Sequence, residues 1–275
     1  MVSNSKCESF RQVANGVDFY CEKRGQGPTV VLVPAADGDA GGFALVAQAL
    51  SDRFTVFTFD LRGCSRSGKP AGGMKPVTAK EGAEDVAALV KACNLAPASF
   101  YGCSMSGQTI LHVGLYHPEI VRNLMVHEVA LLNESPIPGA AEMGFRMILA
   151  KFEKKLGSRN AAVRALGASL ASDPEAQKAP VEDYAKRSHN NGETWLDYYF
   201  GTIDQPTYTA EQLEKLPPVI FTVGLLSPAW LVEGNLKTAR RGNKEVVWLP
   251  CAHVPNITIP DLLAKFIGEQ VQRYL

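Results

Sequence analysis

One stretch reads Ser99-Phe-Tyr-Gly-Cys-Ser-Met-Ser-Gly107 and joins a short apolar run to a helical pattern through a tight turn. The residues around such a turn must be small, because the strand and the helix approach each other closely there. Gly102 meets this need, and Ser106 stands where a second glycine is usual. A serine held in a turn between a buried strand and a helix is typical of an exposed nucleophile. We therefore predict that Ser104 is a catalytic nucleophile; a serine in an ordinary tight turn is the alternative.

Short apolar runs recur on both sides of this stretch and predict a mostly parallel sheet. They lie at 29–33, 55–59, 99–101, 121–126, 219–223 and 246–249. Helical patterns at 83–92, 108–116 and 260–275 would cover the two faces of that sheet. Ahead of the first run, two further strand patterns flank Asn15-Gly16, a dipeptide that suits a hairpin turn. The sheet is thus expected to begin antiparallel and to continue parallel.

The strand pattern stops between 132 and 216, where segments such as 140–156 and 160–171 have helical periodicity. We predict a core domain formed by 1–131 and 217–275, and a helical cap, or lid, over 132–216. A cap of this size would lie above a site at the ends of the parallel strands.

Composition and charge narrow the classes of partner. The chain has 28 Lys plus Arg and 28 Asp plus Glu, so its formal net charge is zero and it lacks the basic excess of a nucleic-acid-binding or membrane-surface protein. Neither a signal peptide nor an apolar run of ~20 residues is present, so a cytoplasmic location is expected. Six cysteines without paired spacing predict neither zinc nor disulfides. The expected partner is a small molecule, with no nucleic acid, no membrane, no metal and no cofactor; a homodimer is left open.

A serine hydroxyl needs a general base, and His253 is the best placed of the histidines. It follows the apolar run 246–249 through a short loop and precedes the last helix, which suits the chain order serine, acid, histidine. The other histidines are His112, His117, His127 and His189. An exposed loop histidine is the alternative reading of His253.

The acid has two candidate positions. It usually follows the strand corresponding to 219–223, but Gly224-Leu-Leu-Ser-Pro228 contains no carboxylate and has Ser227 roughly where an aspartate would be expected. Glu128 comes directly after the preceding strand, 121–126, at the carboxyl end where catalytic residues gather. We therefore predict Glu128 as the acid, and a glutamate that caps the next element is the alternative.

An oxyanion hole in this arrangement takes one N–H from the residue after the nucleophile and another from the loop after the first parallel strand. These would be the backbone groups of Met105 and Ala36. A further loop, Asp60-Leu-Arg-Gly-Cys-Ser-Arg-Ser67, is interpreted as structural.

Taken together, these residues resemble the α/β-hydrolase fold and, within it, the zearalenone hydrolases, which open the macrocyclic ester of resorcylic acid lactones. The resemblance is carried by Val-Val-Leu-Val-Pro at 30–34, Thr-Phe-Asp at 58–60, Ser-Arg-Ser at 65–67, Gly-Cys-Ser at 102–104, His-Glu at 127–128 and Leu-Pro-x-x-His at 249–253. It implies a mostly parallel central sheet with helices on both faces, a helical lid insertion, a triad of Ser104, Glu128 and His253, and no cofactor or metal.

The resemblance also implies substrate contacts. Trp195 matches a tryptophan of the family's lid, and Tyr199 would lie one helical turn away on the same face, with plain packing of the lid as the alternative. Ala35 is a third expected contact; Pro34-Ala-Ala36 and His127-Glu-Val-Ala130 depart from the family's Pro-Asp-Gly and His-Glu-Leu-Pro. The expected reaction is hydrolysis of a lactone such as zearalenone. A general carboxylesterase, a carbon–carbon bond hydrolase and a ligand receptor of low turnover are the alternatives.

Overall fold

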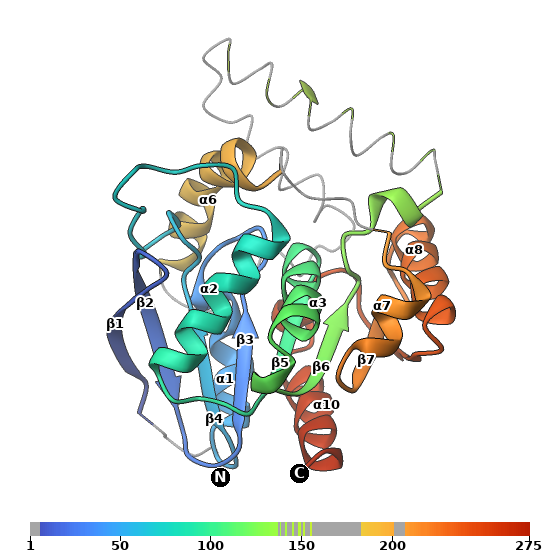
Figure 1. Ribbon diagram of the computed structural model, residues 1–275, viewed down its shortest axis with the longest axis horizontal. Helices are drawn as coiled ribbons and strands as arrows, with labels where there is room; N and C mark the ends of the chain where they lie inside the picture. The colour runs from blue at the N-terminus through green and yellow to red at the C-terminus, as the bar shows by residue number, and fades with distance from the viewer. Residues whose placement is uncertain are drawn as a thin grey trace.

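The computed structural model describes residues 6–136, 183–200 and 207–275, with isolated helical positions between 138 and 155. Its centre is an 8-stranded sheet in the order β1-β2-β4-β3-β5-β6-β7-β8 (Figure 1). The strands are β1 Glu8–Ala14, β2 Val17–Arg24, β3 Thr29–Val33, β4 Thr55–Phe59, β5 Ala98–Cys103, β6 Val121–His127, β7 Val219–Gly224 and β8 Glu245–Leu249. Strand β2 pairs antiparallel with both β1 and β4, and every other pairing in the sheet is parallel.

The predicted hairpin at the start of the sheet is confirmed. Ala14 pairs with Val17, and Asn15 and Gly16 between them have φ of 43° and 72°. Two successive positive φ values match the twist of the flanking strands, which is why this dipeptide is favoured there. The predicted α/β class, with an antiparallel beginning and a parallel remainder, is therefore correct.

Helices cover both faces of the sheet (Figure 1). Buried side chains of α2 (Ala79–Ala92), α3 (Met105–Tyr116) and α8 (Ala229–Arg241) share one core with the sheet, and those of α1 (Ala44–Leu50) and α10 (Pro260–Arg273) share the other. Helix α2 begins four residues before the predicted start, because Thr78 Oγ1 accepts a hydrogen bond from the Glu81 N–H at 3.1 Å and caps it.

The described part of 132–216 contains a short 3-10 turn (Leu132–Glu134), α6 (Tyr184–Thr194), a π-helical turn (Trp195–Tyr199) and α7 (Ala210–Lys215), and no strand. In Figure 1, α6 lies above the end of the sheet toward which the β6 arrow points, the carboxyl end of the parallel strands. The cap over 132–216 stays a prediction, and the helices predicted over 140–156 and 160–171 fall outside the continuously described residues.

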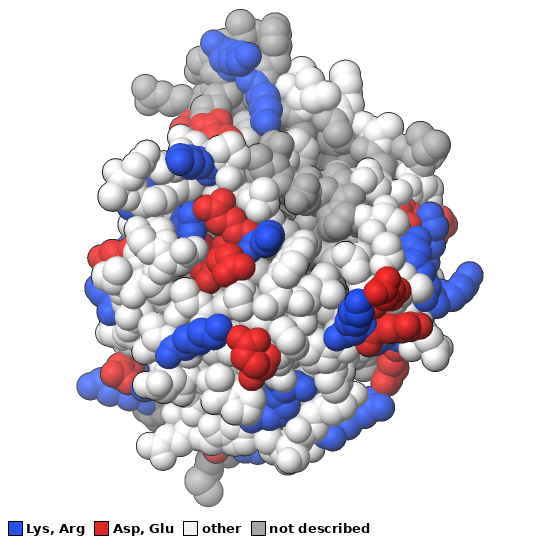
Figure 2. Space-filling model, in the orientation of Figure 1, with Lys and Arg blue, Asp and Glu red and all other residues white. Residues whose placement is uncertain are grey.

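The surface in the view of Figure 2 mixes positive and negative side chains rather than gathering one sign. In the segments that are described, no helix is both long enough and apolar enough to span a bilayer.

Candidate active site

Ser104 sits in a strained turn between β5 and α3. Its φ and ψ are 56° and −119°, a backbone conformation that a non-glycine residue adopts at an energetic cost. The Ser104 N–H donates to the His127 carbonyl at 2.9 Å, and the Ser104 carbonyl accepts from the Gly107 and Ala130 N–H groups, each at 3.1 Å. These bonds fix the turn to the first turn of α3, to the end of β6 and to the loop that follows β6.

The small residues around Ser104 allow this close approach. A Cβ at Gly102 would lie 2.6 Å from the Ser106 carbonyl oxygen, so a side chain there would collide with the first turn of α3. Ser106, which replaces the usual glycine, is buried, and its hydroxyl donates to the Cys103 carbonyl at 2.8 Å and lies 2.9 Å from the Cys103 nitrogen. The serine therefore closes the turn with its own side chain.

Glu128 and His253 are brought together across the sheet although 125 positions separate them in the sequence. His253 Nδ1 lies 2.9 Å from Glu128 Oε2, and the other carboxylate oxygen, Oε1, accepts from the Gly224 N–H at 2.7 Å. Cys103, the residue before Ser104, contacts the His253 carbonyl through its thiol at 3.1 Å. This contact places the loop that carries His253 directly against the turn that carries Ser104.

The environment of Glu128 keeps its carboxylate charged. Burial raises its pKa, but the hydrogen bond from His253, the nearby His127 and Ser227 outweigh this, and the pKa falls to about 2. A carboxylate with that pKa is an acceptor at neutral pH, so His253 Nδ1 carries the proton of the shared hydrogen bond. The second ring nitrogen, Nε2, is then the one that can accept a proton.

Gly224 ends β7 and is tightly packed against the loop that leads to His253. A Cβ there would lie 2.4 Å from the Cys251 carbonyl oxygen, 2.6 Å from Ser227 Oγ and 3.1 Å from the Ala252 carbonyl oxygen. The loop that leads to His253 therefore packs directly on the end of β7. A carboxylate presented from β6 reaches the imidazole from the neighbouring strand.

His127 is the histidine whose surroundings the sequence did not reveal. It is fully buried; Nδ1 lies 2.9 Å from Thr222 Oγ1 and Nε2 lies 3.3 Å from the Ala252 carbonyl oxygen. Burial lowers its pKa to about 4 despite the Glu128 carboxylate 3.7 Å away. With both nitrogens engaged and the ring neutral, His127 is unsuited to be the general base. In the sequence, its position directly before Glu128 was the feature that indicated a place close to the acid.

Four other expected site residues meet in one apolar cluster. Met105, Trp195 and Tyr199 are buried in it, and Ala36 packs against it. Tyr199 donates from its hydroxyl to the Arg62 carbonyl at 2.9 Å. The segment 195–199 is a π-helical turn rather than the expected α-helix, yet Trp195 and Tyr199 still contact the same cluster. Ala35 lies beside it in the loop after β3 and is half-buried, and its carbonyl accepts from the Gly38 N–H.

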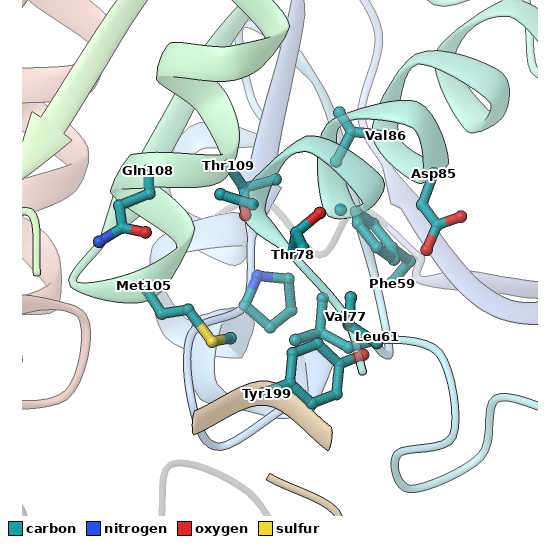
Figure 3. Close-up of a pocket in the computed structure, with 13 residues that line it drawn as sticks. Phe59, Leu61, Val77, Thr78, Asp85, Val86, Met105, Gln108, Thr109 and Tyr199 are labelled. Atoms are coloured by element: carbon teal, nitrogen blue, oxygen red, sulfur yellow. The ribbon is translucent and has the colours of Figure 1, made fainter. Parts of the chain in front are cut away.

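A pocket opens beside Met105, and Figure 3 shows how its walls come from the core and from the π-helical turn. Val77, Met105 and Tyr199 line it with apolar surface, and Thr78 and Gln108 bring polar groups to it. Within the described ranges, no group of three His, Cys, Asp or Glu side chains is arranged to hold a metal ion. The chemistry available here is that of a hydroxyl, an imidazole and a carboxylate beside an apolar pocket.

Asp37, in the loop after β3, has an unusual environment. Desolvation and the charge of Asp39 raise the pKa of its carboxyl to about 7, although the hydrogen bond from the Tyr184 hydroxyl at 3.0 Å acts in the opposite direction. In an unfolded chain the carboxyl would titrate near pH ~4. Its contribution to stability is therefore complete below about pH 4 and is lost as the pH rises through about 7.

The loss of stability with rising pH gives a prediction for Asp37→Asn. The melting temperature of the variant minus that of wild type should be several degrees larger at about pH 8 than at about pH 5, because the amide carries no charge to desolvate. Differential scanning calorimetry at both pH values measures this, with the exposed Asp52→Asn as the control. If Asp37→Asn and wild type shifted in parallel with pH, Asp37 would be ionised throughout.

Comparisons with known proteins identify the family and the fold of the chain. The family model for the alpha/beta hydrolase fold matches residues 28–225. A zearalenone hydrolase of Bionectria ochroleuca is 31% identical over 265 residues, which cover 95% of this chain and 96% of that protein. A zearalenone hydrolase of Cladophialophora bantiana is 30% identical, with 95% of each chain covered. The solved structure of an esterase from Thermogutta terrifontis superposes with a TM-score of 0.76 at 18% identity, over 97% of this chain and 99% of that one.

The fold and these relatives define the class: the protein is an α/β-hydrolase that acts on esters or lactones. Within that class, the chain belongs to the zearalenone hydrolase family.

Proposed function

We propose that this chain hydrolyses the ester bond of a macrocyclic resorcylic acid lactone such as zearalenone, with Ser104, His253 and Glu128 as its catalytic triad. The observation that carries the proposal is the His253–Glu128 hydrogen bond of 2.9 Å, held beside the strained turn of Ser104. The choice of lactone rests on the two relatives named zearalenone hydrolase, each about as long as this chain.

In the proposed reaction, Ser104 Oγ attacks the lactone carbonyl carbon while His253 Nε2 takes the hydroxyl proton. The backbone N–H groups of Met105 and Ala36 stabilise the oxyanion that forms. His253 then protonates the leaving alkoxide as the carbon–oxygen bond of the ring breaks, which leaves a ring-opened acyl group on Ser104. Water attacks this acyl group and gives a proton to His253, which passes it to Ser104 Oγ as the bond between that oxygen and the acyl carbon breaks and the hydroxy acid leaves. Glu128 stays charged and stabilises the imidazolium in both halves.

Trp195 supports a contact with the substrate. Its side chain is 6% exposed, and its indole Nε1–H is buried with no hydrogen-bond partner among the described residues. A buried donor without a partner is costly, and an oxygen of a bound lactone would relieve that cost. The ring also packs in the cluster that contains Met105, next to the proposed oxyanion site.

The experiment that tests the function is product analysis by mass spectrometry after incubation with zearalenone and, in parallel, with an acyclic aryl ester. In water enriched in ¹⁸O, we expect one labelled oxygen in the new carboxyl group and the mass of one added water, before any loss of carbon dioxide. Turnover of the aryl ester alone would indicate a general carboxylesterase. Cleavage of a carbon–carbon bond would indicate that class of hydrolase, and one burst followed by arrest would indicate a receptor.

For Trp195, we predict a loss that depends on the substrate. Trp195→Ala should lower kcat/KM for zearalenone by about 10²-fold and for 4-nitrophenyl acetate by less than about threefold, because the small ester does not reach the indole. Trp195→Phe keeps an aromatic ring, although a smaller one, and removes the N–H, so its loss of kcat/KM for zearalenone should lie between those of wild type and Trp195→Ala. Trp248→Ala, at an exposed position on the edge strand β8, is the control. Equal losses on both substrates together with a lower melting temperature would make Trp195 a packing residue.

A further inference from the structure

Helix α6 presents one face to the loop after β3. Tyr184, Arg187 and Asn191 are three and four positions apart, so they lie on the same side of the helix. The Tyr184 hydroxyl donates to Asp37 Oδ2 at 3.0 Å, and Arg187 donates to both oxygens of Asp39 at 2.7 Å and 3.1 Å. These two residues hold side chains of the loop, and Asn191 holds its backbone.

Asn191 connects three pieces of chain that are far apart in the sequence. Its Nδ2 donates to the Asp37 carbonyl at 2.6 Å and to Ser65 Oγ at 2.7 Å, and its Oδ1 accepts from the Ser65 N–H at 2.7 Å. Ser65 has a φ of 46°, so the accepting amide stabilises a loop residue in a costly conformation. Asn191 is 3% exposed, and water does not readily replace these bonds.

The peptide that Asn191 holds belongs to a tight turn over 35–38. The Gly38 N–H donates to the Ala35 carbonyl at 3.1 Å, and Gly38 has a φ of 65°. A Cβ at Gly38 would lie 2.8 Å from the Cys64 side chain and 3.3 Å from Asn191 Nδ2, so the turn has little room to move on that side. Ala36 is inside this turn. Its N–H belongs to the same peptide group as the Ala35 carbonyl, and the Asp37 carbonyl belongs to the same peptide group as the Gly38 N–H. The hydrogen bond between these two peptide groups therefore couples the orientation of the Ala36 N–H to the Asp37 carbonyl that Asn191 binds.

We propose that Asn191 is a positioning residue for ester hydrolysis, which fixes the turn over 35–38 so that the Ala36 N–H points at the developing oxyanion. This inference rests on the proposed function, since Ala36 acts there as an oxyanion donor. It assigns α6 a role in the chemical step in addition to covering the strand ends.

The test is kinetics of Asn191→Ala with 4-nitrophenyl acetate. Removing an oxyanion donor outright costs about 10²- to 10³-fold in kcat, and a donor that is misdirected should cost about 10- to 10²-fold. KM should change by less than about threefold. The affinity for phenylboronic acid, which forms a tetrahedral adduct on the serine, should fall by the same factor as kcat, because that adduct also places an oxygen in the hole.

Two further variants isolate the cause. Asn190→Ala is the same substitution at the neighbouring exposed position of α6 and should leave kcat and boronate affinity unchanged. Asn191→Asp keeps the shape and the acceptor for Ser65 but removes the donor to the Asp37 carbonyl. It should therefore show the same loss of kcat and of boronate affinity, and it provides the test if Asn191→Ala fails to fold. Folded Asn191 variants with kcat within about twofold of wild type would overturn the proposal. So would a fall in kcat with unchanged boronate affinity. Absence of turnover by wild type would instead refute the proposed function, and boronate affinity would still report on Asn191.

Discussion

Ser104→Ala should reduce kcat on any ester substrate by ~10⁴-fold or more, because the acyl-enzyme cannot form: the Ser106 hydroxyl and the Cys103 thiol in the same turn are buried and bonded to backbone carbonyls. Binding should persist, since the apolar pocket beside Met105 is unchanged. Steady-state kinetics and equilibrium binding of the same substrate measure the two quantities separately.

A matched control is Ser188→Ala, because the Ser188 hydroxyl bonds within its own helix, to the Ala185 carbonyl at 3.2 Å. This variant should keep wild-type kcat. More than a few per cent of wild-type kcat in pure Ser104→Ala protein would be incompatible with a serine mechanism.

Glu128→Gln should lower kcat by ~10²- to 10⁴-fold with little change in substrate binding. The Gly224 N–H at 2.7 Å from Oε1 requires an acceptor there, so the glutamine amide group would face His253 Nδ1. The imidazole would then carry its proton on Nε2 and could not accept one from Ser104. The variant also lacks the anion that stabilises the imidazolium.

Glu233→Gln is the matched control, because Glu233 is exposed on α8 and is the first carboxylate after β7. Its kcat should stay within about twofold of wild type. If Glu233→Gln were the inactive variant and Glu128→Gln the active one, the acid would lie after β7 and the proposed role of Glu128 would be wrong.

The centre of the sheet could be predicted because strands β3 to β7 are largely buried on both faces and their sequences are short apolar runs. Strand β5 extends beyond the predicted 99–101 at both ends, since Ala98 and Gly102-Cys103 pair with neighbours without adding to the apolar signal. Helix α1 has seven residues, and α8 is largely polar, so neither showed a periodicity that the sequence analysis detected.

The sequence predicted those site residues that stand in a recognisable turn or directly after a predicted strand. Glu128 was chosen because it ends a strand and the later position lacks a carboxylate, and the structure brings it to His253. The π-helical turn of Trp195 and the contacts of Asn191 could not be predicted. An α- and a π-helical turn share local sequence preferences, and Asn191 lies 154 and 126 positions from its partners Asp37 and Ser65.

Covalent labelling tests whether Ser104 is the nucleophile that His253 and Glu128 activate. Diethyl 4-nitrophenyl phosphate should transfer one diethylphosphoryl group to Ser104 Oγ and release one equivalent of 4-nitrophenolate, with the serine proton passing through His253 to the medium. Peptide mass mapping of the labelled protein should place that group on Ser104, with the label absent from Ser104→Ala and formed far more slowly in Glu128→Gln. Stoichiometric labelling of another residue, or full turnover of an aryl ester by protein phosphorylated on Ser104, would show that Ser104 is not the nucleophile.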